Sequence, residues 1–192
     1  MAKVWDMKKL KDLTDEEKKQ LLQDAYELGF MYERDYHGCP QAVFGALQEL
    51  FGISEPMAFK AATGLAGGLG LSIRETCGAL NGACLFYSML YGRERDKIDD
   101  PEDKQFVAFA GCLKLRDKYL KEWGSATCRE VMMEQMYRKG RGHRWFNIGA
   151  PEEREEFEEA GGHSDICPDV VGKACMWAAE VILEKEREEK TG

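Results

Sequence analysis

The segment Gly64-Leu-Ala-Gly-Gly-Leu-Gly70, followed closely by Cys77-Gly-Ala-Leu-Asn-Gly82, is the stretch of sequence that constrains the fold most. It follows a predicted helix rather than a strand. It also lacks the glycine spacing of a Rossmann fold and the lysine of a P-loop, so it does not indicate a nucleotide site. Gly78 and Gly82 are four residues apart, which leaves one face of a helix flat. Because another backbone can approach this face closely, the segment favours a fold in which several helix ends meet.

Helix signals lie on both sides of this segment. Val and Ile together number 13 of 192 residues, and this scarcity of strand formers favours helices. Each of the five prolines fits the opening of a helix, and the spacing predicts capping boxes at Thr14–Glu17 and Ser72–Glu75. The predicted helices cover residues 14–33, 40–51, 56–66, 73–91, 101–121, 126–139, 151–160 and 168–189.

We therefore expect an all-α fold, with one compact multi-helix domain over residues 1–192 and the glycine-rich segment between helices. Residues 1–35 are predicted to form an N-terminal helix. Residues 138–164 are predicted to form an irregular excursion, in which basic residues precede the acidic run Glu152–Glu159. In the simpler interpretation, opposite charges tether this excursion to the surface. The alternative is a flap over a site or a partner-docking patch.

Charge and hydropathy exclude several kinds of partner. The formal net charge is −8, whereas phosphate binding needs concentrated positive charge, so we expect no nucleic-acid partner. The sequence shows no export signal and no apolar run of about 18 residues, which predicts a cytoplasmic protein that is not embedded in a membrane. Seven cysteines are an odd number in a reducing compartment. They indicate metal binding or redox chemistry rather than a closed disulfide framework.

Four cysteines fall at or near predicted helix N-termini, where free N–H groups and the helix dipole favour thiolate over thiol. Cys39 and Cys167 each precede a proline and are predicted N-caps, whereas Cys128 lies in a first turn and Cys77 about one turn into its helix. A thiolate is the form that ligates metals and attacks disulfides. We therefore expect these four sulfurs to converge, and we expect Cys39 to be the most reactive thiol.

The other three cysteines, Cys84, Cys112 and Cys175, are flanked by apolar residues and are predicted to fill the core. Cys84 has an alternative role, because it lies seven residues after Cys77 on the same helical face and can reach the same site. Two histidines, His37 and His163, are alternative zinc ligands, but solvated loop positions are the simpler interpretation. Arg74 and Arg129 are predicted either to lower a thiol pKa or to form exposed salt bridges.

These residues resemble a known family. Cys39-Pro-Gln-Ala-Val-Phe44, Gly67-Gly-Leu-Gly70, Cys77-Gly-Ala-Leu-Asn-Gly82, Cys128 and Cys167 together resemble the putative redox-active protein family named for its C_GCAxxG_C_C pattern. The resemblance covers about residues 36–179. It implies a helical module, common in anaerobic bacteria and archaea, whose four signature cysteines map onto Cys39, Cys77, Cys128 and Cys167. The sequence departs from the pattern at Thr76, where a glycine often precedes the cysteine.

Related modules resemble iron–sulfur carriers. The leading hypothesis is therefore an electron-transfer protein that binds an iron–sulfur cluster through the four signature cysteines and passes electrons to a redox partner protein. One alternative is thiol–disulfide chemistry without a metal. The other is a binding or structural module that holds zinc or no metal. The sequence does not decide whether the protein is an enzyme, and it is compatible with a homo-oligomer.

Overall fold

The computed structural model describes residues 3–188, and helices account for most of them. Across these residues the backbone forms no β-strand, which confirms the predicted all-α fold. The α-helices are α1 (Asp15–Tyr36), α2 (Cys39–Phe51), α3 (Pro56–Ala61), α4 (Gly78–Tyr91), α5 (Lys104–Trp123), α6 (Cys128–Arg138), α7 (Pro151–Glu159) and α8 (Cys167–Glu188). Short 3₁₀ helices are η1 (Met7–Asp12), η2 (Ala62–Leu65) and η3 (Arg95–Lys97), and η4 (Gly162–Ile166) is a π-helix.

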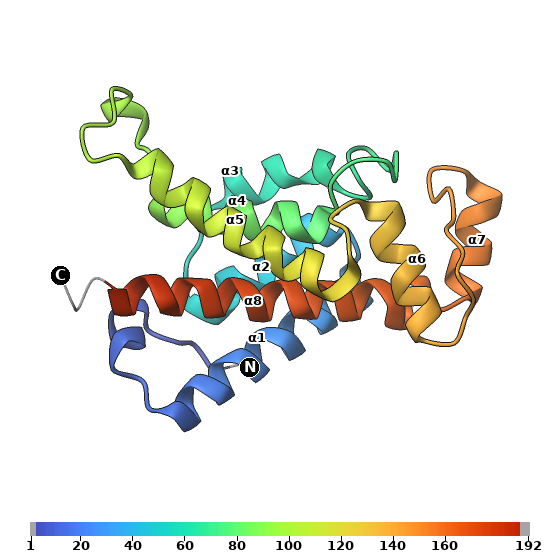
Figure 1. Ribbon diagram of the computed structural model, residues 1–192, viewed down its shortest axis with the longest axis horizontal. Helices are drawn as coiled ribbons and strands as arrows, with labels where there is room; N and C mark the ends of the chain where they lie inside the picture. The colour runs from blue at the N-terminus through green and yellow to red at the C-terminus, as the bar shows by residue number, and fades with distance from the viewer. Residues whose placement is uncertain (1–2, 189–192) are drawn as a thin grey trace.

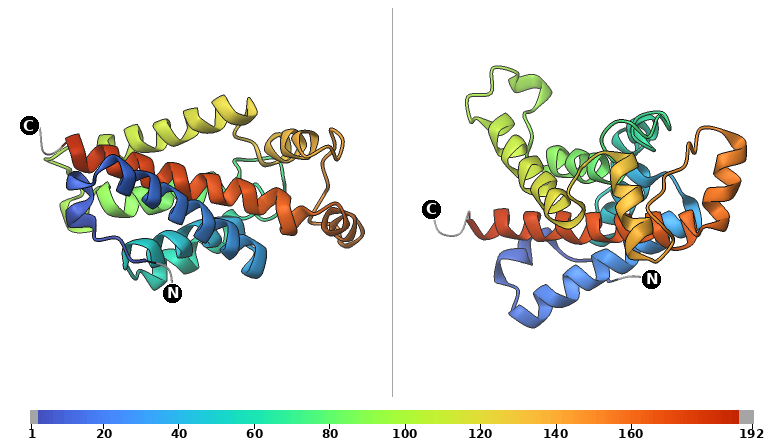
Figure 2. Two further views of the ribbon diagram at one scale, coloured as in Figure 1. Left: turned by 90° about the horizontal axis from the view of Figure 1, so that it is seen from below. Right: turned by 45° about the vertical axis from the view of Figure 1, so that its right-hand side comes forward.

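Helix α8 runs along the long axis of the molecule and is its central element (Figure 1). It packs against α1, α2, α4 and α5, whereas α6 and α7 lie near its N-terminal end (Figure 1, Figure 2). Apolar side chains are buried on several faces of α8, as expected for a helix with neighbours on most sides. Within residues 3–188, none of the helices combines the length and the hydropathy that crossing a bilayer requires.

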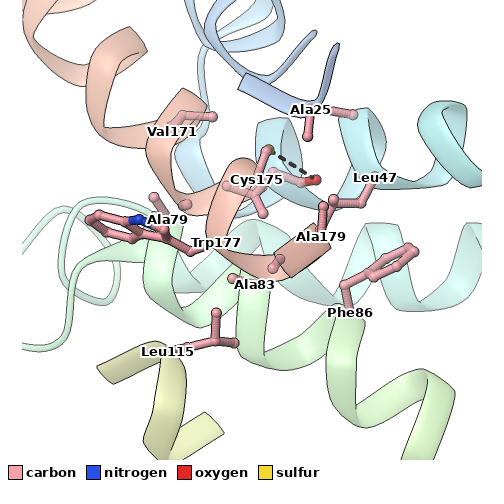
Figure 3. Packing of buried hydrophobic residues seen from close by; sticks show 14 of the residues in the cluster. Ala25, Leu47, Ala79, Ala83, Phe86, Leu115, Val171, Cys175, Trp177 and Ala179 are labelled. Carbon is pink, nitrogen blue, oxygen red and sulfur yellow. Dashed lines mark hydrogen bonds between the residues drawn. The ribbon is translucent and has the colours of Figure 1, made fainter. Parts of the chain in front are cut away.

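The main hydrophobic core lies between these helices (Figure 3). Cys175 of α8 is fully buried there, and its thiol lies 3.9 Å from the carbonyl oxygen of Val43 in α2. Small residues let the helices approach closely, since a Cβ added to Gly29 in α1 would lie 2.5 Å from the Cys175 sulfur. The prediction that Cys175 fills the core is confirmed.

Most predicted helix ends lie within three residues of the observed ones. The capping box of α1 is confirmed, because the N–H groups of Glu17 and Thr14 donate to each other's side chains. The helix predicted from Pro101 begins three residues later, at Lys104. Pro101 instead lies in a turn, and the Asp100 carboxylate accepts the first two backbone N–H groups of α5 at 2.9 Å. The predicted end of α8 at residue 189 lies outside the described residues.

The predicted helix start at residue 73, with its capping box at Ser72–Glu75, is wrong. Leu69, Leu71 and Ile73 have φ values of 67°, 62° and 59°, which a right-handed helix cannot use. The Ser72 hydroxyl donates to a carbonyl four residues earlier instead of capping a helix. Residues 66–77 therefore form a loop, and α4 begins only after Cys77.

The flat face predicted on α4 is confirmed. A Cβ added to Gly82 would lie 2.5 Å from the carbonyl oxygen of Pro40, in the first turn of α2. Only glycine therefore allows the start of α2 to pack against α4 at this distance. This contact brings the N-terminal ends of the two helices together.

The excursion at residues 138–164 contains α7 and is tethered by ion pairs, as predicted. Arg138 contacts Glu122 of α5 at 2.9 Å, and Arg144 contacts Glu156 at 2.8 Å within the excursion. The excursion also has apolar side chains that pack against the start of α6 and the glycine-rich loop, so it is more than a surface appendage. Together with side chains of the loop and of α6, they form a second buried cluster, which consists of Ile73, Cys128, Met132, Met136, Phe146, Ile148, Phe157 and Ile166.

Candidate four-cysteine site

Four cysteines that are far apart in the sequence stand at the starts of four helices. Cys39, Cys128 and Cys167 are the first residues of α2, α6 and α8, and Cys77 is the N-cap of α4. The predicted placement of Cys77 one turn into its helix is therefore wrong, because the loop before it extends further than expected. All four side chains line one cavity.

Backbone hydrogen bonds hold Cys77 beside Cys128. An isolated antiparallel bridge pairs Thr76 with Thr127, the residues just before the two cysteines. The Cys77 N–H donates to the Ala126 carbonyl at 2.8 Å, and the Cys128 N–H donates to the Glu75 carbonyl at 2.9 Å. The starts of α4 and α6 are thus fixed relative to each other by main-chain contacts.

Glycines bring the remaining elements close to these cysteines. A Cβ on Gly78 would lie 2.5 Å from the Cys39 sulfur, so glycine leaves the space that Cys39 occupies beside the start of α4. A Cβ on Gly68 would lie 2.9 Å from the Cβ of Cys128, which places the glycine-rich loop against α6. The Cys-Gly-Ala-Leu-Asn-Gly82 motif therefore shapes the site as well as the helix packing.

The predictions that Cys39 and Cys167 are N-caps are both wrong, because each is the first residue of its helix and Gly38 is the N-cap of α2. The π-helix η4 leads directly into α8, and the backbone N–H of Cys167 already donates to the carbonyl of Gly162. Because that N–H group is used, the start of α8 offers fewer free donors than an isolated helix end. The π-helix instead determines where the thiol lies.

The cavity has a volume of about 60 Å³ and a largely apolar wall. Besides the four cysteines, two ionisable side chains line it, Glu33 of α1 and His163 of η4. Ile148 of the excursion also lies on the wall, so the excursion covers part of the site as the flap interpretation suggested. The other apolar lining residues are Ala66, Leu71, Ala79, Val131, Met132, Ile166, Val170 and Val171.

Burial raises the pKa of each of the four thiols above its usual value, and the nearby Glu33 carboxyl adds to the effect. At Cys77 the backbone N–H groups of Ala79 and Leu80 and the Tyr119 hydroxyl act in the opposite direction, but burial outweighs them. In the metal-free protein, burial therefore opposes the expected effect of the helix ends on these thiols, and the ranking of Cys39 as the most reactive thiol stays a prediction.

Glu33 is a site residue that the sequence analysis missed. It is 1% exposed, and no group among the described residues hydrogen-bonds to its Oε2. Burial, followed by the charge of Glu158, raises its pKa to about 8. The sequence did contain a signal for the burial of Glu33, because this residue continues the four-residue spacing of the buried residues Leu21, Ala25 and Gly29 on one face of α1.

The histidines form a short polar link from Glu33 to the surface. His163 Nε2 lies 4.0 Å from Glu33 Oε1, while His163 Nδ1 contacts the exposed Glu158 carboxylate. Burial lowers the pKa of His163, which favours the neutral ring. The exposed His37 ring packs at a tilt against the His163 ring, with centroids 4.2 Å apart, and does not line the cavity.

A buried polar cluster positions the helices that carry Cys128 and Cys167. Asp169 of α8 accepts hydrogen bonds from Tyr26 of α1 at 2.6 Å and from Gln135 of α6. Burial opposes the ionisation of Asp169, but hydrogen bonds from these side chains and the nearby Lys173 keep its pKa below the usual value. The first turn of α8 is thus joined to α1 and α6.

The remaining candidates lie outside the cavity. Cys84 does not line the cavity; it is half-buried and packs against the main core. Cys112 is also half-buried and is not part of that core, so the prediction that it fills the core is wrong. Arg129 pairs with Glu130 at 3.6 Å, as the salt-bridge interpretation predicted. The Arg74 side chain is exposed.

Among the described residues, no three His, Cys, Asp or Glu side chains are placed so that they could hold one metal ion as they stand. The four thiols therefore share a cavity without meeting at one point. The donor set consists of sulfur atoms, with a buried carboxylate and an imidazole on the same wall.

Comparison with known proteins agrees with this motif. The family model described as "Putative redox-active protein (C_GCAxxG_C_C)" matches residues 37–181, close to the range expected from the sequence. No curated protein and no solved structure matches the chain significantly. Since the matched range covers most of the chain and all four signature cysteines, the protein belongs to the C_GCAxxG_C_C family of putative redox-active proteins.

Proposed function

We propose that this protein is a one-electron carrier in which Cys39, Cys77, Cys128 and Cys167 ligate an iron–sulfur cluster. The observation that carries the proposal is that these four thiols, from four helix starts, line one apolar cavity. Cysteine thiolates are the usual ligands of iron–sulfur clusters, and a cluster would supply one-electron redox chemistry.

The size and shape of the cavity support a group larger than one ion. Its volume of about 60 Å³ exceeds the roughly 10–15 Å³ that one water molecule needs. A single zinc ion would require its donors within about 2.0–2.3 Å of one point. No such arrangement exists among the described side chains, whereas a multi-atom cluster can connect thiols that stand apart.

The electrostatics of the site favour a metal group over exchange between free thiols. Thiol–disulfide exchange needs a thiolate nucleophile, but burial raises the pKa of all four thiols. Metal coordination removes the thiol proton and neutralises the resulting charge. A buried set of four cysteines is therefore better suited to hold a cationic metal group than to attack a disulfide.

The chain also offers groups that can tune bound sulfur. The N–H groups of Ala79 and Leu80 lie near the Cys77 sulfur. The buried Tyr119 hydroxyl also lies near this sulfur and makes no hydrogen bond of normal length to any described group. Donors beside a ligating sulfur stabilise the extra negative charge of a reduced cluster and raise its potential. The excursion limits access of water, and electrons would pass to a partner protein.

An anaerobic metal assay tests the proposal. We expect brown protein with visible absorption and stoichiometric iron and acid-labile sulfide, and we expect Cys77→Ala and Cys128→Ala to lose all three. Cys175→Ala is the matched control, because Cys175 is buried but does not line the cavity. Colourless protein with a redox-dependent thiol count would support thiol–disulfide chemistry instead. Colourless protein with bound zinc and constant thiols would support a zinc module.

A further inference from the structure

A second pair of cysteines lies outside the four-cysteine cavity, where α4 packs against α5. The Cys112 sulfur of α5 lies 3.7 Å from the carbonyl oxygen of Cys84 in α4 and 3.6 Å from the Ser88 hydroxyl. Each of the two thiols is also the largest influence on the pKa of the other. Cys84 is two turns further along α4 than Cys77, or about 10 Å at 1.5 Å per residue.

Unusually close packing of the two helices brings these thiols together. Gly111, the residue before Cys112, faces the ring of Tyr87, and a Cβ at this position would overlap ring carbons. Because glycine has no Cβ, α5 can pack directly on Tyr87. The adjacent Cys112 is thereby brought to Cys84 and Ser88 on α4.

Reagents in solution can reach this pair. Both cysteines are half-buried, whereas Cys175 is fully buried. Phe109 and Leu113, which flank Cys112 on α5, are 60% and 55% exposed. Cys112 therefore borders the solvent-facing side of the helix, and Cys84 beside it is also half-buried.

We infer that Cys84 and Cys112 form a second redox couple, a dithiol that reduces low-molecular-weight disulfides and closes to a protein disulfide. In the first step the Cys112 thiolate attacks one sulfur of the small disulfide RSSR. The bond within RSSR breaks, a mixed Cys112–S–S–R disulfide forms, and RS⁻ leaves and takes up a proton to become RSH.

In the second step the Cys84 sulfur attacks the Cys112 sulfur of the mixed disulfide. The Cys84–Cys112 bond forms, the second RS⁻ leaves, and it takes up the proton that Cys84 loses. The two cysteines have then lost two electrons, and RSSR has become two RSH. This couple needs no metal, so the inference does not depend on the proposed cluster.

The electrostatics agree with these two roles. Hydrogen bonding from Cys84, assisted by Ser88, lowers the pKa of Cys112 to about 7. The hydrogen bond with Cys112, followed by burial, raises the pKa of the Cys84 thiol. An attacking thiol works best when its pKa is near the ambient pH, so Cys112 is suited to react first and Cys84 to resolve the mixed disulfide.

Peptide mapping of the full-length protein tests the inference. Reduced protein is incubated anaerobically near pH 7 with glutathione disulfide, the remaining thiols are alkylated, and unreduced peptides are analysed by mass spectrometry. We expect a disulfide between Cys84 and Cys112 and release of two equivalents of glutathione. In Cys84→Ser we expect glutathione to remain on Cys112, and in Cys112→Ser we expect neither product on Cys84.

Three results would overturn the inference: no Cys84–Cys112 peptide in the wild type, first modification of a cysteine other than Cys112, or release of the same amount of glutathione by Cys112→Ser. The wild-type map and the Cys84→Ser adduct are independent readouts, so a poorly folded Cys112→Ser variant leaves the test intact. Iron measured in the same samples keeps the two proposals apart. Intact iron without the disulfide refutes only this inference, and the disulfide without iron refutes only the cluster.

Discussion

Helix α4 connects two cysteine environments that differ in charge preference. At its start, Cys77 joins three other cysteines around an apolar cavity, where burial raises the pKa of each of the four thiols. Two turns further along, Cys84 contacts Cys112 at the half-buried junction with α5, where the pKa of Cys112 falls to about 7. Membership of a cysteine motif therefore does not identify the most ionised thiol. Burial and local donors decide that property.

The difference suggests a division of chemistry within one chain. A cavity that disfavours free thiolates suits ligands whose charge a metal group neutralises. A thiolate at the edge of the solvent suits direct exchange with disulfides. Four experiments, from the largest expected effect to the smallest, can break or sharpen this comparison.

Glu33→Gln tests how strongly the cavity disfavours charge. Burial raises the pKa of Glu33 from 4.5 to about 8. As the pH rises, Glu33 therefore ionises in the unfolded chain before it ionises in the folded protein. The stability of the folded protein is highest below about pH 4.5 and falls as the pH rises from 4.5 to 8. We expect the Glu33→Gln variant to match the wild type in stability at pH 4.5 and to exceed it at pH 9, by at most about 5 kcal/mol. Urea unfolding of metal-free, reduced protein measures this.

Glu155→Gln is the control for this experiment, because the Glu155 side chain is exposed and does not line the cavity. It should change the pH dependence of unfolding only slightly. Parallel stability curves for the wild type and Glu33→Gln would show that the cavity tolerates the carboxylate charge. The contrast between a cavity that disfavours charge and a junction that tolerates it would then not hold.

Timed alkylation compares the two cysteine groups directly. Burial raises the pKa of the four cavity thiols, whereas a hydrogen bond from Cys84 lowers the pKa of Cys112 to about 7. We expect iodoacetamide to modify Cys112 at least about tenfold faster than Cys39 in metal-free protein, with peptide mass spectrometry as the readout. Modification of Cys39 first would restore the helix-end argument and contradict the role assigned to burial.

Gly111→Ala tests whether close helix packing creates the Cys84–Cys112 pair. The new Cβ would overlap the Tyr87 ring, so the helices or the ring must move, at a cost of roughly 1–3 kcal/mol. We expect a lower unfolding free energy and slower formation of the Cys84–Cys112 disulfide with glutathione disulfide. Ala110→Ser, at the exposed neighbouring position, should leave both unchanged. Unchanged disulfide kinetics in Gly111→Ala would mean that the pair forms without this contact.

Local sequence signals predicted most helix ends, because proline, glycine and capping residues act on their nearest neighbours. The start of α4 was missed because Leu69, Leu71 and Ile73 adopt left-handed φ values that no local preference of leucine or isoleucine indicates. Thiol pKa values were also misjudged. The helix-end effect is local, but the burial that outweighs it comes from the glycine-rich loop, α1 and the excursion, which only the folded chain brings together.

Cys175→Ala sets the baseline against which both cysteine groups can be judged, and it should have the smallest effect. Cys175 is 0% exposed and packs from α8 against α1 and α2 (Figure 3). It does not line the cavity. Losing one buried sulfur leaves a small void, so we expect a destabilisation of about 1 kcal/mol in urea unfolding. Iron content and the yield of the Cys84–Cys112 disulfide should both match the wild type. Loss of either would show that a core cysteine supports redox chemistry, and position relative to the cavity would no longer separate structural from functional thiols.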